Sequence, residues 1–230
     1  MKTIGLIGGM SWESTLEYYR IINETVKARL GGFHSARCTL VSLDFAEIEA
    51  LQREERWSEQ ALILQEAARS LESAGADFIV LCTNTMHKLA EDISEAVRIP
   101  LLHIADATAR KVQDAGLRKV GLLGTRFTME QDFYRERLER HRLTVLIPGE
   151  SQRELIHRVI YDELCLGLIR ESSRADFAEI IADLVNNGAQ GIILGCTEIE
   201  LLVRSDDSLV PVFPTTRIHA EAAVDFALRS

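Results

Sequence analysis

Two stretches of the chain end in small polar residues of the kind that acid–base chemistry uses. One covers residues 76–85 and the other residues 189–198, and each is an apolar, β-branched run that stops abruptly at such residues. This pattern is typical of a buried parallel strand that presents functional groups at its carboxyl end. When the two stretches are aligned, Thr83 matches Cys196, which lies 113 residues later. The first candidates for chemistry are therefore one hydroxyl and one thiol.

Cys196 lies where a predicted strand meets the next helix. A helix N-terminus favours an anion, so we expect this thiol to ionise below its ordinary pKa of about 8.5. The resulting thiolate would be a nucleophile or a proton acceptor. A free cysteine is more often a small buried hydrophobe. Gly195 before it and Thr197 and Glu198 after it favour the functional interpretation, because a core position needs no such polar neighbours.

Thr83 holds the matching position, and its hydroxyl both donates and accepts hydrogen bonds but is a far weaker acid than a thiol. Cys82 is the competing candidate. Neighbouring residues of a strand point to opposite faces, and the alignment pairs Cys82 with Gly195. Cys82 is therefore predicted to lie in the core. Packing is also expected for Cys38 and Cys165, and four such separated cysteines without paired histidines predict no zinc site.

A second pair of segments repeats in the same order. Residues 3–9 match residues 119–125, at an offset of 116. Two matches at nearly one offset predict a duplicated α/β unit, with lobes at 1–115 and 116–230. The two strand ends would then face one cleft, and the last helix of each half is a candidate to cross to the other lobe.

Strands alternate with helices along the whole chain, which predicts parallel βαβ units whose ligands bind beyond the carboxyl ends of the strands. Helix starts are assigned to Ser11, Asp44, Thr128 and Ser151, the last three each with Glu or Gln three residues on. The glycines at 5, 8 and 9 do not have the spacing of a dinucleotide fingerprint and instead predict a tight turn. Predicted strands cover 3–8, 38–43, 76–83, 101–103, 119–123, 143–147, 189–196 and 210–213.

The composition excludes several classes of protein. A hydrophobic content of 47% and a mean hydropathy of +0.01 fit a globular protein with a substantial core. The net charge is −9 and basic residues are scattered, so no nucleic-acid partner is expected. The longest apolar runs are strand-sized, and the sequence has neither a signal-peptide pattern nor a C-x-x-C pair. We therefore expect no membrane partner and a cytoplasmic location.

Three further features carry weaker signals. The polar run 52–57 follows a predicted short helix, and it is either a solvated connection or a lid that supplies a cation or an amide. His87 and His103 follow strand ends. Each either approaches the cleft or is a buried histidine with satisfied hydrogen bonds.

Several motifs together resemble the cofactor-independent aspartate/glutamate racemase family, over essentially the whole chain. The similarity is greatest to its enterobacterial branch, the L-aspartate/glutamate-specific or broad-specificity amino-acid racemases. The motifs lie at residues 8–15, 81–88, 103–108, 123–134 and 195–198.

The resemblance implies two α/β lobes related by pseudo-twofold symmetry, with the active site in the cleft between them. It also implies an amino-acid substrate, no pyridoxal phosphate or other cofactor, no metal, and a homodimer. Family members carry a cysteine at each strand end, whereas this chain has Thr83 in place of the first. Substrate-binding residues implied by family position are Met10, Gln52, Arg53, Asn84, Thr85, Thr197 and Glu198.

The resemblance also bears on specificity. Aspartate-specific members carry a lysine where this chain has Cys165, so strict selection of an acidic side chain is in doubt. Arg53 is the candidate partner of a substrate carboxylate.

The mechanism that follows uses Cys196 as general base on one face of the α-carbon and Thr83, directly or through a water, on the other. Donors from Asn84, Thr85 and Thr197 would stabilise the developing carbanion. An unequal pair predicts different kcat values for the two enantiomers. The ratio kcat/KM must nevertheless be equal in both directions, because enantiomers have equal free energy. Other readings stay open: a single-thiol decarboxylase of substituted malonates, a hydantoin racemase or isomerase, and a non-catalytic amino-acid binder.

Overall fold

The computed structural model describes residues 1–229 and divides into two compact units. The first unit contains residues 1–104 together with 219–229, and the second contains residues 105–218. The sequence placed the boundary between 115 and 116, whereas these units divide after Ile104 and after Ile218. The helix at Ile104–Asp114 therefore belongs almost entirely to the second unit, and most of the last helix, Thr215–Leu228, belongs to the first.

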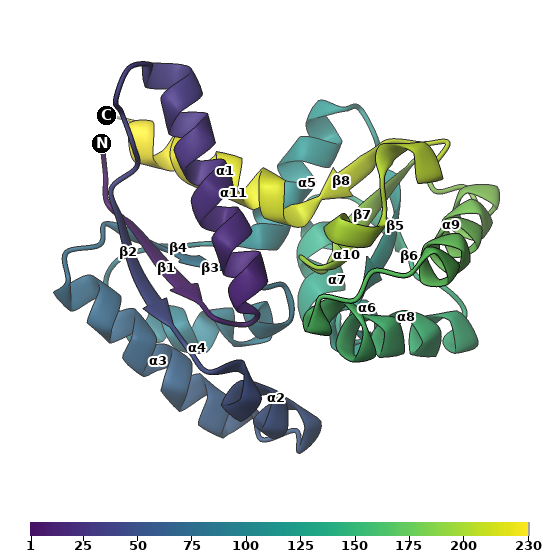
Figure 1. The fold of residues 1–230 in the computed structure, drawn as a ribbon, viewed down its shortest axis with the longest axis horizontal. Coiled ribbons are helices and arrows are strands. Elements are labelled where there is room, and N and C mark those ends of the chain that lie inside the picture. The colour runs from purple at the N-terminus through teal and green to yellow at the C-terminus, as the bar shows by residue number, and fades with distance from the viewer. Residues whose placement is uncertain (230) are drawn as a thin grey trace. The chain divides into compact units, whose positions relative to one another are not determined.

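Each unit is an α/β structure with a four-stranded parallel sheet (Figure 1). In the first unit the strands are β1 (Ile4–Gly8), β2 (Cys38–Ser42), β3 (Phe78–Leu81) and β4 (Leu101–Leu102). Its helices are α1 (Trp12–Leu30), α2 (Phe45–Arg53), α3 (Trp57–Ser73), the 3-10 turn η1 (Thr85–Leu89), α4 (Ala90–Glu95) and most of α11 (Thr215–Leu228).

The second unit repeats this order of strands. Its strands are β5 (Lys119–Gly124), β6 (Thr144–Leu146), β7 (Gly191–Gly195) and β8 (Val212–Pro214). Its helices are α5 (Ile104–Asp114), α6 (Arg126–Glu130), α7 (Asp132–Arg140), α8 (Glu150–Asp162), η2 (Leu164–Leu166), α9 (Glu171–Asn186), α10 (Ile199–Leu202) and η3 (Ser205–Asp207).

The two sheets have the same topology and the same register. Their strand orders are β2-β1-β3-β4 and β6-β5-β7-β8. The pair Ile7 and Leu81 in the first sheet corresponds to Leu123 and Leu194 in the second, at the offsets of 116 and 113 that the sequence repeat has. The predicted duplication is therefore a repeat of structure, position by position. Thr83 and Cys196 each lie two residues beyond one of these matched pairs.

Alternation along the strands divides the core of the first unit into two layers. Ile7, Ile79 and Leu81 pack against α2, α3 and α4, while Leu6 and Val80 pack on the opposite face against α1 and α11. Figure 1 shows these two groups of helices on the two faces of the sheet.

The same alternation directs Cys82 into the second of these layers. The residue is fully buried beside Val80, in the layer that α1 and α11 cover. The expectation that Cys82 is a core residue is therefore confirmed. Burial also raises the pKa of its thiol far above the ordinary value, which removes it as a source of thiolate.

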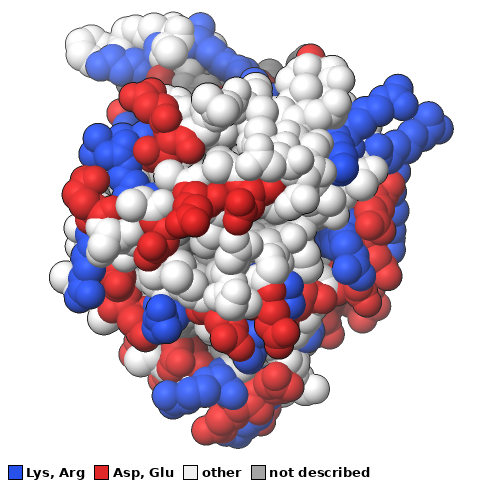
Figure 2. Space-filling view, turned by 90° about the vertical axis from the view of Figure 1, so that its right-hand side faces the viewer, with Lys and Arg blue, Asp and Glu red and all other residues white. Residues whose placement is uncertain are grey.

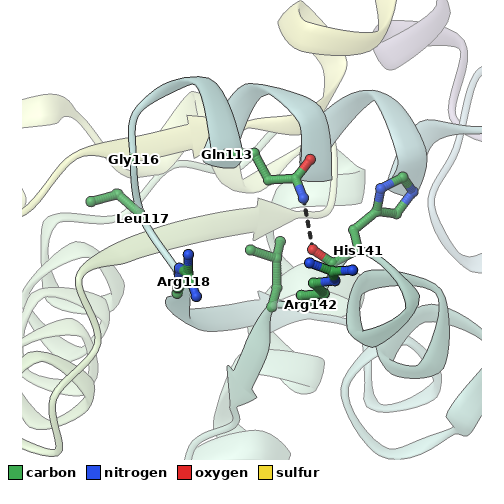
Figure 3. Close-up of a pocket in the computed structure, with 7 residues that line it drawn as sticks. Gln113, Gly116, Leu117, Arg118, His141 and Arg142 are labelled. Atoms are coloured by element: carbon green, nitrogen blue, oxygen red, sulfur yellow. Dashed lines mark hydrogen bonds between the residues drawn. The ribbon is translucent and has the colours of Figure 1, made fainter.

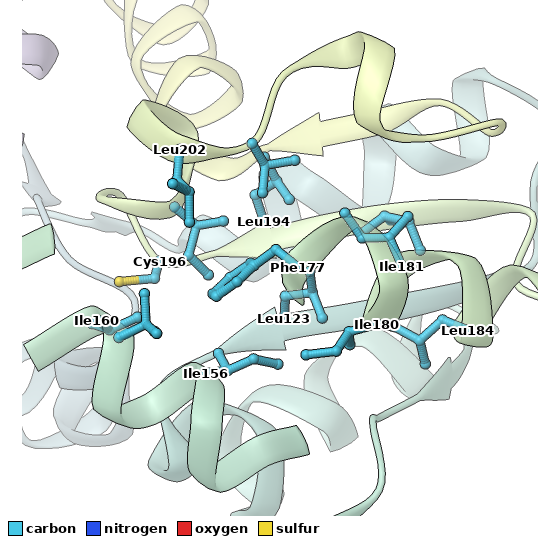
Figure 4. Packing of buried hydrophobic residues seen from close by; sticks show 14 of the residues in the cluster. Leu123, Ile156, Ile160, Phe177, Ile180, Ile181, Leu184, Leu194, Cys196 and Leu202 are labelled. Carbon is cyan, nitrogen blue, oxygen red and sulfur yellow. The ribbon is translucent and has the colours of Figure 1, made fainter. Parts of the chain in front are cut away.

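One cluster of apolar side chains fills the space between the second sheet and helices α8 and α9 (Figure 4). Phe177 is fully buried in this cluster, with Leu123 and Leu194 from the sheet beneath it. Cys196 lies at one end of the cluster, next to Ile160. The thiol is thus held at the margin of a close-packed core.

Helix starts differ from the prediction in two places. The predicted start at Thr128 is wrong, because α6 begins earlier and Thr125 accepts the Thr128 N–H with its side chain. The predicted start at Ser151 is also late: α8 begins at Glu150, and the Gln152 side chain accepts the Gly149 N–H at 3.0 Å. The caps at Ser11 and Asp44 are confirmed.

The charge distribution and the helices add little that points to a large partner. On the face shown in Figure 2, acidic and basic side chains are interspersed around an uncharged area, and no continuous basic patch is visible. No helix within residues 1–229 is both long enough and apolar enough to span a bilayer.

Candidate active site

In the first unit, the segment that follows β3 is held by its main chain. The Thr83 N–H donates to the Leu81 carbonyl at 2.9 Å, and the Cys82 N–H donates to the Ile7 carbonyl at 2.9 Å. The Ser14 hydroxyl donates to the Cys82 carbonyl at 3.1 Å. These bonds fix the backbone, while the Thr83 hydroxyl makes no hydrogen bond within residues 1–229. The backbone therefore fixes the position of this residue while its hydroxyl keeps its hydrogen-bonding capacity, and the residue is 9% exposed.

The predicted substrate-binding residues of the first unit divide into buried and exposed ones. Met10, Asn84 and Thr85 are buried at the carboxyl ends of the strands. Gln52 is buried on α2, and its Nε2 lies 2.9 Å from the Met86 Sδ. Arg53, the candidate partner of a substrate carboxylate, is exposed at the end of α2.

A glycine turn adjoins these residues, and the sequence had pointed to it. Gly9 has a φ of +87°, and a side chain there would collide with the main chain of Leu43. The Gly9 N–H donates to the Thr15 hydroxyl at 2.8 Å. Only glycine combines this backbone angle with such a close approach. The turn therefore places Met10 beneath the strand ends.

Histidines form a buried group on the same side of the first unit. The rings of His87 and His103 have centroids 4.5 Å apart, and those of His87 and His219 are 5.7 Å apart. Tyr18 donates its hydroxyl proton to His219 Nδ1 at 2.8 Å, since His219 Nε2 lies 2.8 Å from the Leu102 carbonyl, which can only accept. Burial lowers the pKa of His219 to about 4, so this ring is neutral at pH 7.

In the second unit, the candidate catalytic group is a thiol that is hydrogen-bonded to a carboxylate. The Cys196 Sγ donates to the Glu198 Oε2 at 3.0 Å, and the Thr197 hydroxyl donates to the same oxygen at 2.6 Å. Cys196 is 8% exposed and Glu198 is 4% exposed. Two protons thus converge on one buried carboxylate oxygen.

This geometry corrects the expectation of an acidic thiol. Burial raises the pKa of Cys196 well above its ordinary value, and the Glu198 charge raises it further. The helix that follows is too short to offset these effects, because α10 begins only at Ile199 and ends at Leu202. The resting group at this strand end is therefore a thiol that donates a hydrogen bond to Glu198. Sequence reasoning placed Glu198 near the substrate but missed this bond.

Cys165 lies in η2, partly buried against the same cluster as Cys196. It is close enough for its charge to raise the pKa of Cys196. Cys165 is therefore a neighbour of Cys196.

A further carboxylate occupies α10. Glu200 accepts the Thr216 N–H at 2.8 Å, which ties α10 to the first turn of α11. Burial raises the pKa of Glu200 to about 7. No residue type or spacing in the sequence indicates this, because the desolvation depends on the packing of α10.

The cavity shown in Figure 3 lies at the amino ends of strands β5 and β6, opposite to the strand ends that carry the candidate site. It has a volume of about 280 Å³ and is lined by segments 116–118 and 141–143, which directly precede β5 and β6. The Gln113 side-chain amide donates to the His141 carbonyl at 2.7 Å across its rim. Helices α5 and α7 both end here. A positive charge is favourable near a helix C-terminus, which explains why Arg118 and Arg142 lie at this cavity. His141 also lines the cavity, and its Nε2 lies 3.0 Å from the Asp106 Oδ1.

The fold and the two strand ends define a protein with a duplicated α/β unit and a buried thiol and hydroxyl at matching positions. A model of the family described as Asp/Glu/hydantoin racemase matches residues 7–223, and the chain belongs to this family. Among the residues the structure describes, no group of three or more His, Cys, Asp or Glu side chains is arranged to hold a metal ion.

Relatives with known structures cover the whole chain. A protein of Yersinia pestis, provisionally described as an Asp/Glu racemase, is 58% identical, covers 100% of both chains and has a TM-score of 0.93. An aspartate racemase homologue from Pyrococcus horikoshii is 35% identical over 100% of both chains, with a TM-score of 0.86. The broad-specificity amino-acid racemase RacX of Bacillus subtilis is 25% identical over 166 residues, which span 69% of this chain and 68% of that protein.

Proposed function

We propose that this protein is a cofactor-independent amino-acid racemase that interconverts the L and D forms of aspartate or glutamate, and of other amino acids. In this proposal Thr83 and Cys196 transfer protons on the two faces of the α-carbon. The observation that carries it is the matched register of the two sheets, which gives one hydroxyl and one thiol equivalent positions beyond β3 and β7. Family membership supports the reaction class.

Proton transfer at Cys196 begins from the thiol. Glu198 accepts the thiol proton along the 3.0 Å hydrogen bond, and the thiolate then removes the α-hydrogen of the substrate. Electrons of the broken C–H bond remain on the α-carbon and spread into the carboxylate. Donors from Asn84 and Thr85 stabilise this charge in a site of low polarity, together with the main-chain N–H of Thr197, whose hydroxyl is bonded to Glu198.

Thr83 completes the inversion from the other side. Its hydroxyl proton passes to carbon, and a water molecule returns a proton to the threonine oxygen, so no free alkoxide has to persist. The hydroxide left by that water is neutralised by the proton that Glu198 took from the thiol, which Glu198 releases to solvent. A threonine and a cysteine are unequal acids, and the enantiomers should therefore differ in kcat and in KM. Their kcat/KM values stay equal because the equilibrium constant is one.

Substrate range is proposed to be broad rather than strictly acidic. Cys165, a neighbour of Cys196, supplies no cation for a side-chain carboxylate, whereas the family resemblance implies a lysine at this position in aspartate-specific members. Arg53 is left as the candidate for that contact, and a homodimeric assembly remains a prediction.

The test is α-proton exchange in D₂O with the L and D forms of aspartate, glutamate and a panel of neutral amino acids. We expect exchange and racemisation in the wild type, loss of racemisation in Cys196→Ala, and a faster or more balanced reaction in Thr83→Cys. Cys38→Ala is the matched control, because Cys38 is a half-buried strand residue of β2. A wild type that exchanges no α-proton, or a Cys196→Ala variant that still racemises, would refute the proposal.

The second candidate is a decarboxylase of substituted malonates. One observation favours it: only one of the two matched strand ends carries a thiol, and protonation of a carbanion on one face needs a single acid. Release of carbon dioxide from an arylmalonate, without α-proton exchange in any amino acid, would identify this activity.

A further inference from the structure

His87 joins the segment that carries Thr83 to the start of α5. Its Nδ1 lies 2.7 Å from the Thr83 carbonyl, and the Ile104 N–H donates to its Nε2 at 3.1 Å. The side chain is 2% exposed. One ring therefore bridges the main chain at Thr83 and at Ile104, which lie 21 residues apart in the sequence.

The two bonds determine the tautomer of this histidine. A main-chain N–H can only donate, so Nε2 must accept with its lone pair and carries no proton. A carbonyl can only accept, so the proton lies on Nδ1 and is donated to Thr83. The ring is consequently neutral, and each nitrogen has one fixed role. A histidine held in this way is unsuited to acid–base catalysis, but it is well suited to orienting a neighbour.

The bond from His87 meets the only part of the Thr83 backbone that the strand does not hold. The Thr83 N–H is already bonded to Leu81, and the preceding carbonyl, that of Cys82, accepts from Ser14. The Thr83 carbonyl belongs to the peptide unit that follows the Cα atom carrying the side chain. With the Leu81 bond on the preceding peptide unit and the His87 bond on the following one, the main chain is restrained on both sides of that Cα atom.

We propose that His87 is a positioning residue for Thr83, holding the threonine hydroxyl in line with the α-carbon of the substrate. The inference rests on the proposed racemase function and adds a residue that acts only on the Thr83 face. Its loss should leave proton transfer at Cys196 intact. A displacement of about 1 Å at a reacting group costs on the order of 100-fold in rate.

Two substitutions separate the roles of the two ring nitrogens. The amide of His87→Asn ends near the place of Nδ1 and can still donate to the Thr83 carbonyl. The amide of His87→Gln ends near the place of Nε2 and can still accept the Ile104 N–H, but it does not hold Thr83. The two variants have the same kind of side chain and remove the same buried ring.

The readout is the ratio of deuterium exchange to inversion in D₂O. When the Thr83 face fails, Cys196 removes the α-proton of one enantiomer and returns a deuteron to the same face, so exchange continues without inversion. Thr83→Ala identifies that enantiomer and gives the limiting ratio. Because the readout is a ratio, a variant that folds only in part still reports on the site.

We expect His87→Gln to raise the ratio by about 10- to 100-fold, towards that of Thr83→Ala, and His87→Asn to change it less than about threefold. His219→Asn is the control for disruption of the histidine group, and it should lower the melting temperature without moving the ratio. Equal ratios in the Asn and Gln variants, whether high or low, would overturn the positioning role while leaving the racemase intact. A wild type that exchanges no α-proton would instead refute the proposed racemase function, and with it the positioning role of His87.

Discussion

Burial and the Glu198 charge together raise the pKa of Cys196, and replacing Glu198 with glutamine should make the thiol more reactive towards alkylating agents. In the wild type a buried thiol donates to a buried carboxylate at 3.0 Å. Ionisation would place two negative charges side by side, so the carboxylate raises the pKa of Cys196 in addition to the effect of burial. Glu198→Gln removes that charge and keeps the shape of the side chain.

The size of the effect follows from the distance. Two unit charges 3.0 Å apart repel by roughly 5 kcal/mol at an effective dielectric constant of about 20. Removing this repulsion increases the thiolate population of Cys196. A more stable thiolate is intrinsically less nucleophilic, which cancels about half of the logarithmic gain, and relaxation of the pair removes more. We therefore expect alkylation to be about 10- to 100-fold faster.

The assay is the rate of carbamidomethylation of Cys196 by iodoacetamide at pH 8, followed by peptide mass spectrometry. The Cys38 peptide is the internal reference, because that thiol is half-buried and burial raises its pKa to about 11. Glu200→Gln is the matched control, since Glu200 lies on the same segment but makes no bond to the thiol. Its Cys196 should react at the wild-type rate.

An unchanged or slower rate in Glu198→Gln would refute the reasoning, because the carboxylate would then not be what keeps Cys196 protonated. The rate of racemisation provides a second, independent measurement. Glu198→Gln should racemise more slowly despite its more reactive thiol, because the acceptor for the thiol proton has been removed.

The remaining predictions concern stability. Burial raises the pKa of Glu200 to about 7, so the folded state keeps a proton that the unfolded chain has lost, and the free energy of unfolding should fall by about 3 kcal/mol as pH rises from 4.5 to 7. In urea titrations at several pH values, Glu200→Gln should abolish this slope; parallel curves would contradict the assignment. The pKa of His219 is lowered to about 4, so its contribution is complete above pH 6.5 and is lost as pH falls towards 4, again by about 3 kcal/mol. His219→Asn should flatten that acid limb, and an unchanged limb would exclude His219 as its source. Gly9→Ala should lower the free energy of unfolding by at least about 3 kcal/mol, against about 1 kcal/mol for Gly31→Ala, since both have positive φ but only Gly9 meets a neighbouring main chain. Equal thermal shifts for the two alanine variants would show that the close approach is unimportant.

Sequence alone determined the architecture and the matched strand ends. The alternation of apolar runs with amphipathic segments predicted parallel βαβ units, and the two offsets predicted the duplication that the sheets display. The period of two in a strand also placed Cys82 in the core and left its neighbour Thr83 as the candidate functional residue. These features depend on local residue patterns or on repeats, so they can be recognised in the sequence without the structure.

Tertiary structure alone decided the protonation of the site. The sequence suggested an acidic thiol at a helix N-terminus, whereas Cys196 is a thiol because burial and Glu198 outweigh a helix of a single turn. Likewise, His87 carried two open interpretations until the Ile104 N–H and the Thr83 carbonyl fixed its tautomer. Desolvation and the direction of a hydrogen bond depend on which distant segments meet, and neither residue type nor spacing records that.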